Sequence, residues 1–423
     1  MLTLLLINYL FSGVVILPAF VIYLITGMAS LVGAVTFFVL FLVLPALSLA
    51  ICCLLGWVLA LISSRMRHKN LVTLLLSLSF LVLYFVGMGA FSTMMETVDP
   101  TALDIRPIVS SVTPYLLVFN WIGAAVCGNL PAGGLFLLFA VAVCAGVMLF
   151  LSKSYIAIVT ANRGTVRVKY REKAVRQSSP MWALIRKELR RFTGSAAYMM
   201  NEGLGLVFAV LLSILLLVKS GDLSTVFASE DLLPFAFLLD ALPVAIGGVL
   251  CIMSSMVMIS APSVSLEGRS VWISQSMPIP PDKPLLAKVY MHILVATPFF
   301  LLSSLLSVIA LRPDPFSGVM IFVLPLISNI FCAHVGVFFG ILFPRLDWIN
   351  EVVPLKQGAA VGFTMLTMMV LTVLLYIGMI LLALIGVPGG LCMLAVSLLF
   401  FFGSLGLHAY LVRGGARRFA NLS

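Results

Sequence analysis

Ten long apolar stretches constrain the fold of this chain more than any other feature of its sequence. A helix needs about twenty apolar residues, rising about 1.5 Å each, to cross the hydrocarbon core of a bilayer. The stretches cover approximately residues 2–26, 31–63, 71–92, 132–151, 203–219, 233–260, 289–311, 317–342, 359–385 and 390–412. Lipid cannot satisfy exposed backbone amides, and no alternating pattern favours a barrel. The sequence therefore predicts an all-α polytopic membrane protein with about ten transmembrane helices.

The composition excludes an ordinary soluble domain, because 62% of the 423 residues are hydrophobic and only 9% are charged. The net charge of +10 would suggest a nucleic-acid partner in a soluble chain, but here the basic residues map onto loops, so no nucleic acid is expected. The seven cysteines lie mostly inside apolar stretches, and the four histidines are dispersed. Neither a disulfide framework nor a metal site is indicated.

Lys and Arg accumulate on the cytoplasmic side of polytopic proteins, which gives an independent test of orientation. With the N-terminus inside, only Arg106, Lys219 and Arg312 of the 25 basic residues lie outside. Both termini are then predicted to be cytoplasmic. Residues 113–130 are apolar, but if they crossed the membrane the basic loops that follow would fall on the outer side. We therefore expect an outer-face or re-entrant helix there.

An internal repeat is indicated by shifting the chain by 280 positions. Residues 43–65 then align with residues 323–345 without a gap, and seven of the 23 positions are identical. Repeated halves are common in transporter folds. Met1 aligns with Pro281, so residues 181–280 have no counterpart in the first half. We interpret the first repeat as incomplete at its N-terminal side, either through a shortened gene model or through natural truncation.

The predicted organisation follows from the spans, the repeat and the charges. Residues 1–151 form a first bundle of four spans, and residues 152–192 form a basic cytoplasmic segment. Residues 193–423 form a second, related bundle of six spans, with a cytoplasmic loop at residues 260–288.

The end of the basic segment has the pattern of an amphipathic helix. Trp182, Leu184, Ile185 and Leu189 fall on one broad side, and the other side carries the cations Arg186, Lys187, Arg190 and Arg191. Such a helix is expected in the headgroup layer, with its apolar side in the acyl boundary and its cations toward anionic lipid. The alternative is that these basic residues only fix the orientation of the chain in the membrane, with positive charge on the cytoplasmic side.

The loop at residues 260–288 is too apolar and too rich in proline for a flexible tether. It contains Val271, Trp272, Ile273, Met277 and Ile279. This pattern predicts a short amphipathic helix, ended by a proline turn, that docks in a groove of a cytoplasmic protein. Packing on the protein's own cytoplasmic face is the alternative.

The RKEL sequence at Arg186, the SLEGRSVWISQSMPIP loop and the following AK pair resemble the permease subunits of type-two ABC exporters. The resemblance implies an elbow helix and a coupling loop that contacts an ATPase subunit. The implied elbow spans Trp182 to Phe192, with Trp182, Arg186, Lys187, Glu188, Arg190 and Arg191. The implied coupling residues are Glu267, Gly268, Arg269, Trp272, Met277, Pro278, Ile279 and Pro280. The first half lacks both features, so a second permease chain is an expected partner beside membrane lipid and the ATPase.

The chain lacks a nucleotide site of its own, because it contains no Gly-Lys dipeptide and therefore no phosphate-binding loop. No HExxH or GxSxG motif supports an intramembrane enzyme. We therefore expect a permease of the bacterial cytoplasmic membrane that performs no reaction and binds no cofactor, with ATP and Mg²⁺ held by the partner subunit.

Polar residues within the spans leave a different function open. Asp240 and His334 are candidates for a polar cavity, and they support an ion-coupled secondary transporter as the alternative function. Asn8, His292 and Asn329 are expected to form hydrogen bonds between helices.

Overall fold

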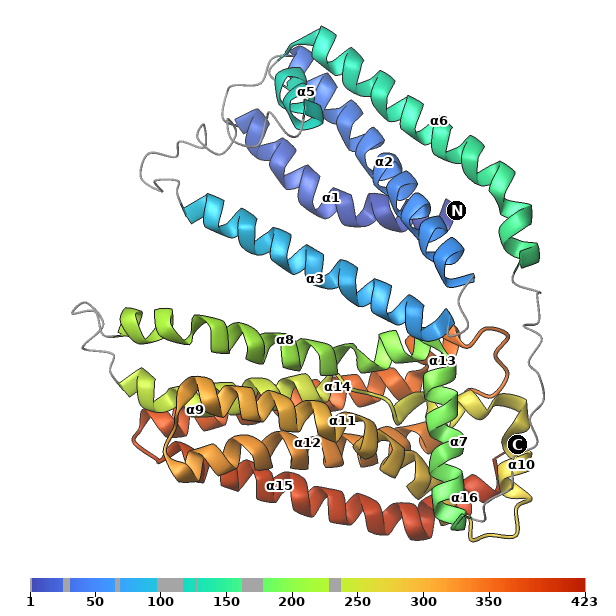
Figure 1. Ribbon diagram of the computed structural model, residues 1–423, viewed down its shortest axis with the longest axis vertical. Coiled ribbons are helices and arrows are strands. Elements are labelled where there is room, and N and C mark those ends of the chain that lie inside the picture. The colour runs from blue at the N-terminus through green and yellow to red at the C-terminus, as the bar shows by residue number, and fades with distance from the viewer. Residues whose placement is uncertain are drawn as a thin grey trace. The chain divides into compact units, whose positions relative to one another are not determined.

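The computed structural model describes residues 2–25, 31–64, 69–96, 117–126, 128–161, 178–227 and 237–422 (Figure 1). The chain divides into two compact units, unit 1 (Met1–Arg171) and unit 2 (Glu172–Ser423), and each is described by itself. Within the described ranges every regular element is a helix. The all-α class predicted from the sequence is confirmed.

Among the residues that the structure describes, eight helical segments are long and apolar enough to cross a membrane. They are Leu4–Ile25, Val32–Val58, Leu130–Lys153, Ala196–Gly221, Asp282–Leu311, Pro315–Leu342, Val352–Leu384 and Gly389–Ala420. Two shorter apolar helices, Leu75–Ala90 and Ala241–Ser255, coincide with the other two predicted spans. These segments indicate a polytopic membrane protein, whereas the full count of ten and the orientation stay predictions.

Unit 1 is built around one central helix. Its helices are α1 (Leu2–Ile25), α2 (Leu31–Ser64), α3 (Lys69–Glu96), α5 (Leu117–Val126) and α6 (Leu130–Ala161). Helix α2 packs against each of the other helices described in this unit. Asn8 Nδ2 donates to the carbonyl oxygen of Pro45 at 3.0 Å, which confirms that Asn8 joins two helices. Helix α5 has 10 residues, too few to cross a bilayer, and its place at the outer face stays a prediction.

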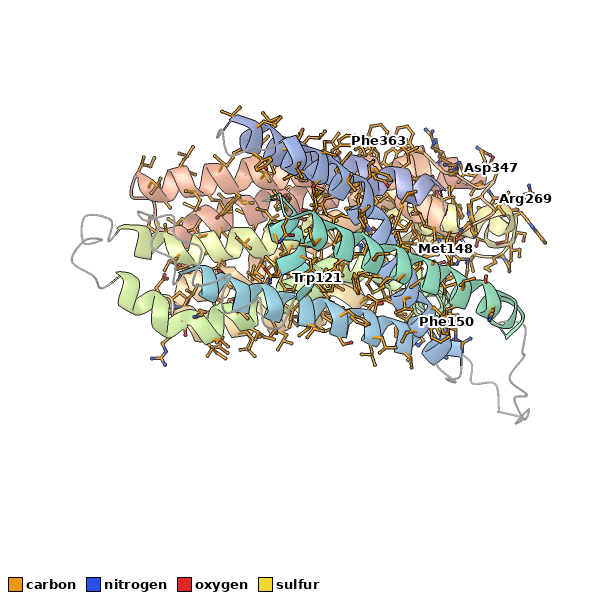
Figure 2. The ribbon with its side chains drawn as sticks, turned by 90° about the horizontal axis from the view of Figure 1, so that it is seen from above. Trp121, Met148, Phe150, Arg269, Asp347 and Phe363 are labelled. Atoms are coloured by element: carbon orange, nitrogen blue, oxygen red, sulfur yellow. The ribbon has the colours of Figure 1, made fainter. Side chains whose placement is uncertain are left out.

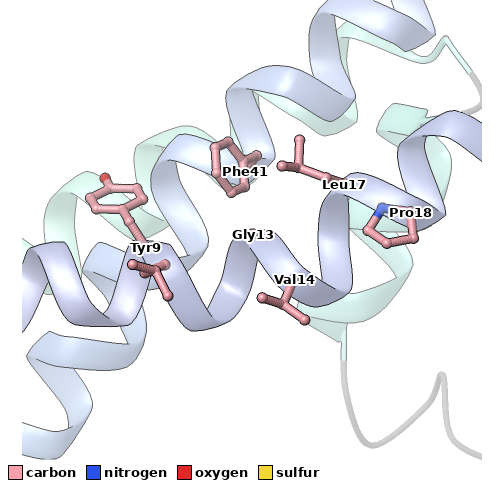
Figure 3. Close-up of a pocket in the computed structure, with 7 residues that line it drawn as sticks. Tyr9, Gly13, Val14, Leu17, Pro18 and Phe41 are labelled. Atoms are coloured by element: carbon pink, nitrogen blue, oxygen red, sulfur yellow. The ribbon is translucent and has the colours of Figure 1, made fainter.

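A shallow groove of about 510 Å³ lies between α1 and α2. Figure 3 shows Phe41 of α2 beside Gly13 and Leu17 of α1, with Tyr9 and Pro18 farther along α1. Nearly all of its lining is apolar. An apolar groove on an apolar helix pair is compatible with a surface that faces acyl chains.

Unit 2 also has a central helix. Its long helices are α7 (Pro180–Gly194), α8 (Ala196–Phe227), α9 (Phe237–Ser255), α11 (Asp282–Leu311), α12 (Pro315–Leu342), α14 (Ala359–Leu384) and α15 (Gly389–Tyr410). Its short elements are η2 (Ala261–Ser263), η3 (Ser265–Ser270), α10 (Val271–Gln275), α13 (Val352–Lys356), the π-helical turn η4 (Leu411–Gly415) and α16 (Ala416–Ala420). Helix α12 packs against α9, α11, α14 and α15.

The central helices α2 and α12 carry the segments that align in the predicted repeat. Each contains the aligned proline, Pro45 or Pro325, and each packs against a preceding helix that contains Pro18 or Pro298. Proline inside a helix removes a backbone hydrogen bond and bends the helix. A duplication would produce this correspondence, but the repeat itself stays a prediction.

The helix ends around the loop at residues 260–288 differ from the approximate limits of the predicted spans. The span predicted over 233–260 ends at Ser255, and the chain then enters the buried 3-10 turns η2 and η3. Helix α11 begins at Asp282 rather than near residue 289, because Pro284 falls in the first turn, where a helix tolerates proline. Lys288, which the sequence placed in the loop, therefore lies inside α11.

Candidate functional site

The segments that the sequence selected as elbow and loop meet at one end of unit 2. Figure 1 shows α7, α10 and α16 together at that end. Helix α7 packs against α11, and η2 packs against α12. Residues 162–177 of the predicted basic segment lie outside the described residues.

The centre of this site is a buried lysine between two buried carboxylates. Lys288 Nζ lies 2.6 Å from Glu267 Oε1 and 3.0 Å from Glu188 Oε1. It also donates to the carbonyl oxygen of Ser263 at 3.1 Å. The Lys288 side chain is fully buried, and those of Glu267 and Glu188 are nearly so. One ammonium group therefore joins α7, η3 and α11.

Two further cations complete the network, which we call the ion cluster (Lys187, Glu188, Arg191, Glu267, Ser274 and Lys288). Lys187 Nζ lies 3.5 Å from Glu267 Oε1 and donates to Ser274 Oγ at 2.9 Å. Ser274 in turn donates to Glu267 Oε2 at 2.6 Å. Arg191 Nη1 lies 3.3 Å from Glu188 Oε2. Each carboxylate thus has more than one partner, as a buried charge requires.

The electrostatics of the cluster favour an ionised Glu267. Burial by itself raises the pKa of this carboxyl group. The charges of Lys288 and Lys187, together with hydrogen bonds from Lys288 and Ser274, outweigh burial and lower its pKa to about 2. The loop is therefore held by a charge that persists at neutral pH.

Helix α7 forms where the sequence predicted it, but its apolar side faces protein. Ser179 caps the helix by accepting from the Trp182 backbone N–H, and Pro180 occupies the first turn. Leu184, Ile185, Glu188 and Phe192 are buried in unit 2. The predicted contact of Leu184 and Ile185 with the acyl boundary is therefore wrong, because Glu188 on the same side is drawn to Lys288.

The outward side of α7 carries the residues that remain available to a headgroup layer. Trp182, Arg186 and Arg190 are exposed, whereas Lys187 and Arg191 belong to the ion cluster. The six elbow residues thus divide into an exposed set and a set that holds the helix to the protein.

The predicted short helix in the loop is confirmed as α10, and its preceding turn depends on one glycine. Gly268 has φ +53° and ψ −142°, a conformation that favours glycine. A Cβ atom there would lie 3.3 Å from the Trp348 ring. Trp348 Nε1 donates to the carbonyl oxygen of Ser265 at 2.6 Å, and the Arg345 backbone N–H donates to Ser265 Oγ at 3.0 Å.

The segment from Phe343 to Glu351 is a functional candidate that sequence reasoning missed. It connects α12 to α13, supports the loop through Trp348, and contains the fully exposed Ile349. Ser195, between α7 and α8, binds Glu351 Oε1 at 2.8 Å. The sequence feature that could have identified this segment is the pair of apolar residues Trp348 and Ile349 in a short polar loop. Trp272 was selected because of the same feature.

The predicted coupling residues divide into buried and exposed groups. Glu267 and Gly268 are buried, and the Glu267 carboxylate is engaged in the ion cluster. Met277 and Ile279 are half-buried against the core of unit 2. The exposed residues are Arg269, Trp272, Pro278 and Pro280, to which the structure adds Ile273. Trp272 and Ile273 are exposed at 62% and 45%, so packing on the protein's own face does not account for them.

A groove of about 480 Å³ lies beside α10, and we call it the α10 groove. It is lined by Gly268, Arg269, Val271, Trp272, Gln275, Leu346, Asp347 and Leu422. Figure 2 shows Arg269 and Asp347 at the same end of unit 2. The groove thus combines an apolar floor with one basic and one acidic residue, a composition suited to another protein surface.

The polar residues within the spans are mostly engaged between helices. His334 Nδ1 lies 2.8 Å from the carbonyl oxygen of Ile330, and its Nε2 lies 3.3 Å from His408 Nδ1 on α15. His292 Nε2 of α11 lies 3.1 Å from Asn329 Oδ1 of α12, which confirms the prediction that each of these residues bonds to another helix. Asp240 belongs to α9, but its side chain lies outside the described residues.

No cluster of three or more His, Cys, Asp or Glu side chains suited to a metal ion occurs among the residues that the structure describes. No family model matches the chain, and no curated protein or solved structure is significantly similar to it.

Proposed function

We propose that the chain is the membrane-spanning permease subunit of an ATP-driven ABC exporter in the bacterial cytoplasmic membrane. A separate subunit binds ATP and Mg²⁺, and this chain moves substrate between inward and outward openings. The observation that carries the proposal is the exposed apolar pair Trp272 and Ile273 on a loop that a buried ion cluster fixes to two helices.

The ion cluster gives the loop a physical connection to the helix bundle. A displacement of α10 is opposed by Ser274, which binds Glu267, and by Glu267, which binds Lys288 of α11. Glu188 extends the same connection to α7. Closure of an ATPase dimer against Trp272 would therefore bias the packing of α7 and α11, as a ligand biases a two-state element.

The exposed part of α7 supports a contact with lipid headgroups. Trp182 lies beside Arg186 and Arg190 on the outward side of the helix. An aromatic ring with guanidinium groups suits the boundary between acyl chains and anionic headgroups. A second permease chain would supply the elbow and the loop that the first half of this chain lacks.

The test is co-purification of the chain with an ATPase subunit encoded beside it, followed by ATP-dependent transport in vesicles. The double variant Trp272→Asp and Ile273→Asp should reduce association at least tenfold, because both side chains are exposed and their removal leaves the core intact. Thr193→Asp, an exposed position at the end of α7, is the matched control and should associate normally. Unchanged association of the double variant would contradict the assignment, as would transport without nucleotide.

One observation favours the second candidate, an ion-coupled secondary transporter. His334 and His408 share a ring-to-ring contact within the apolar helices α12 and α15, and such a pair can exchange a proton. This function predicts pH-driven transport by the isolated chain, abolished by His334→Phe. The ABC permease predicts no such transport.

A further inference from the structure

The segment Leu411–Leu422, which we call the C-terminal strap, continues the last long helix of unit 2 into the site. Helix α15, the π-helical turn η4 and α16 follow one another without an intervening loop from Gly389 to Ala420. The turn η4 packs against α11 and α12. Single π-helical turns are rare and are frequent at functional positions.

The strap is bonded to α10 through a single side chain. Gln275 Nε2 donates to the carbonyl oxygens of Phe419 and Leu422, both at 2.8 Å. Phe419 lies in the last turn of α16 and Leu422 just beyond it, and the Phe419 carbonyl oxygen also accepts from the Leu422 backbone N–H at 3.3 Å. Both donor hydrogens of one amide are therefore used to fix the strap to the loop.

The strap also forms part of the floor beneath α10. The Phe419 ring is fully buried in a cluster with Val264, Val271 and Ile341. Arg418 Nη2 donates to the carbonyl oxygen of Leu342, the last residue of α12. Leu422 packs against the same cluster and lines the α10 groove. The loop thus rests on residues that belong to α15 and its extension.

We propose that the C-terminal strap is a positioning element that sets α10 for its partner and transmits the movement of α10 to α15. A helix of five residues has little stability of its own, so its orientation depends on what packs beneath it. The continuous helical path from η4 to α15 lacks a hinge loop. This inference rests on the proposed function for its partner, but the positioning contact is a property of the chain alone.

The first measurement is hydrogen–deuterium exchange of the isolated full chain in detergent. Gln275→Leu and Phe419→Ala should raise amide exchange in residues 264–275 at least tenfold, while exchange in α14 stays unchanged. Arg417→Ala, an exposed change in the same short helix α16, is the control and should leave exchange unaltered. Gln275→Leu keeps the test valid if Phe419→Ala fails to fold. No rise in exchange for Gln275→Leu would overturn the positioning role.

The second measurement is transport per ATP hydrolysed with the ATPase subunit in vesicles. Gln275 lines the α10 groove, so Gln275→Leu weakens association as well as the contact with the strap. We therefore expect at least a fivefold loss of transport per ATP hydrolysed, measured only in vesicles that contain the assembled complex. Raised exchange with unchanged transport per ATP would overturn the transmission role. If the wild-type chain binds no ATPase subunit, the proposed function and the transmission role are both overturned. Raised exchange in Gln275→Leu would still support the positioning contact in that case.

Discussion

Lys288 and Glu267 form a contact of 2.6 Å between side chains that are both almost completely buried. They come from different elements, α11 and η3, and the same lysine holds Glu188 of α7. A buried ion pair often contributes little net stability, but the loss of one partner leaves an uncompensated charge in the interior. The pair therefore fixes the position of the loop more than it adds to the total stability.

Replacement of Lys288 by Met should destabilise the chain by about 3–5 kcal/mol, because two buried carboxylates lose their common cation. Thermal unfolding in detergent measures the effect. Lys283→Met is the control, since Lys283 is exposed and pairs with Asp282 at 3.5 Å, and its loss should change stability by about 1 kcal/mol or less. The triple variant Lys288→Met, Glu188→Gln and Glu267→Gln should recover much of the lost stability. If Lys288→Met and the triple variant lose equal stability, unpaired buried carboxylates are not the cause.

The stability of unit 2 should depend on acid through Glu267. Its pKa in the folded chain is lowered from 4.5 to about 2, so ionised Glu267 favours folding at pH values above 4.5. This contribution, of the order of a few kcal/mol, is lost as the pH falls from 4.5 toward 2. The melting temperature of wild type should therefore fall more steeply over this interval than that of Glu267→Gln. Parallel acid profiles would exclude Glu267 as the titrating group.

Gly268→Ala should destabilise the loop by about 1–3 kcal/mol, since alanine is strained at positive φ. The added methyl group would also press on the Trp348 ring. Chemical denaturation reports the loss of stability, and the emission of a variant that keeps Trp348 as its single tryptophan reports the contact with the ring. Gly362→Ala in α14, where a Cβ atom meets nothing within 4 Å, is the control and should be neutral or slightly stabilising. An unshifted emission spectrum in Gly268→Ala would argue against the Trp348 contact.

Gly336→Ala should cost about 1–3 kcal/mol, because its Cβ atom would overlap Ser260 and lie 2.9 Å from the Ala261 backbone nitrogen. The loop segment η2 could then no longer approach α12. Gly56→Ala is the matched control at the aligned position of unit 1, where a Cβ atom meets nothing within 4 Å. Equal unfolding midpoints for the two variants would show that the close approach of η2 to α12 is not required.

The sequence by itself determined the class of fold, because long apolar stretches impose a helical membrane architecture whatever their tertiary contacts. It also predicted α7 and α10, since amphipathic spacing and prolines act locally. Asn8, His292 and Asn329 were predicted to join helices for the same reason: a polar group in an apolar span needs a partner.

Only the tertiary structure decided what these elements contact. The sequence assigned Glu267 to a docking surface and the apolar side of α7 to lipid, but the fold buries Glu267 against Lys288 and buries Leu184 and Ile185 of α7, whereas Trp182 stays exposed. A helical pattern shows which side chains share a face, yet it carries no information on whether lipid or protein covers that face. The pairing of Lys288 with Glu188 and Glu267, and that of Gln275 with the carbonyls of Phe419 and Leu422, joins segments far apart in the chain, so it became visible only once the helices were packed.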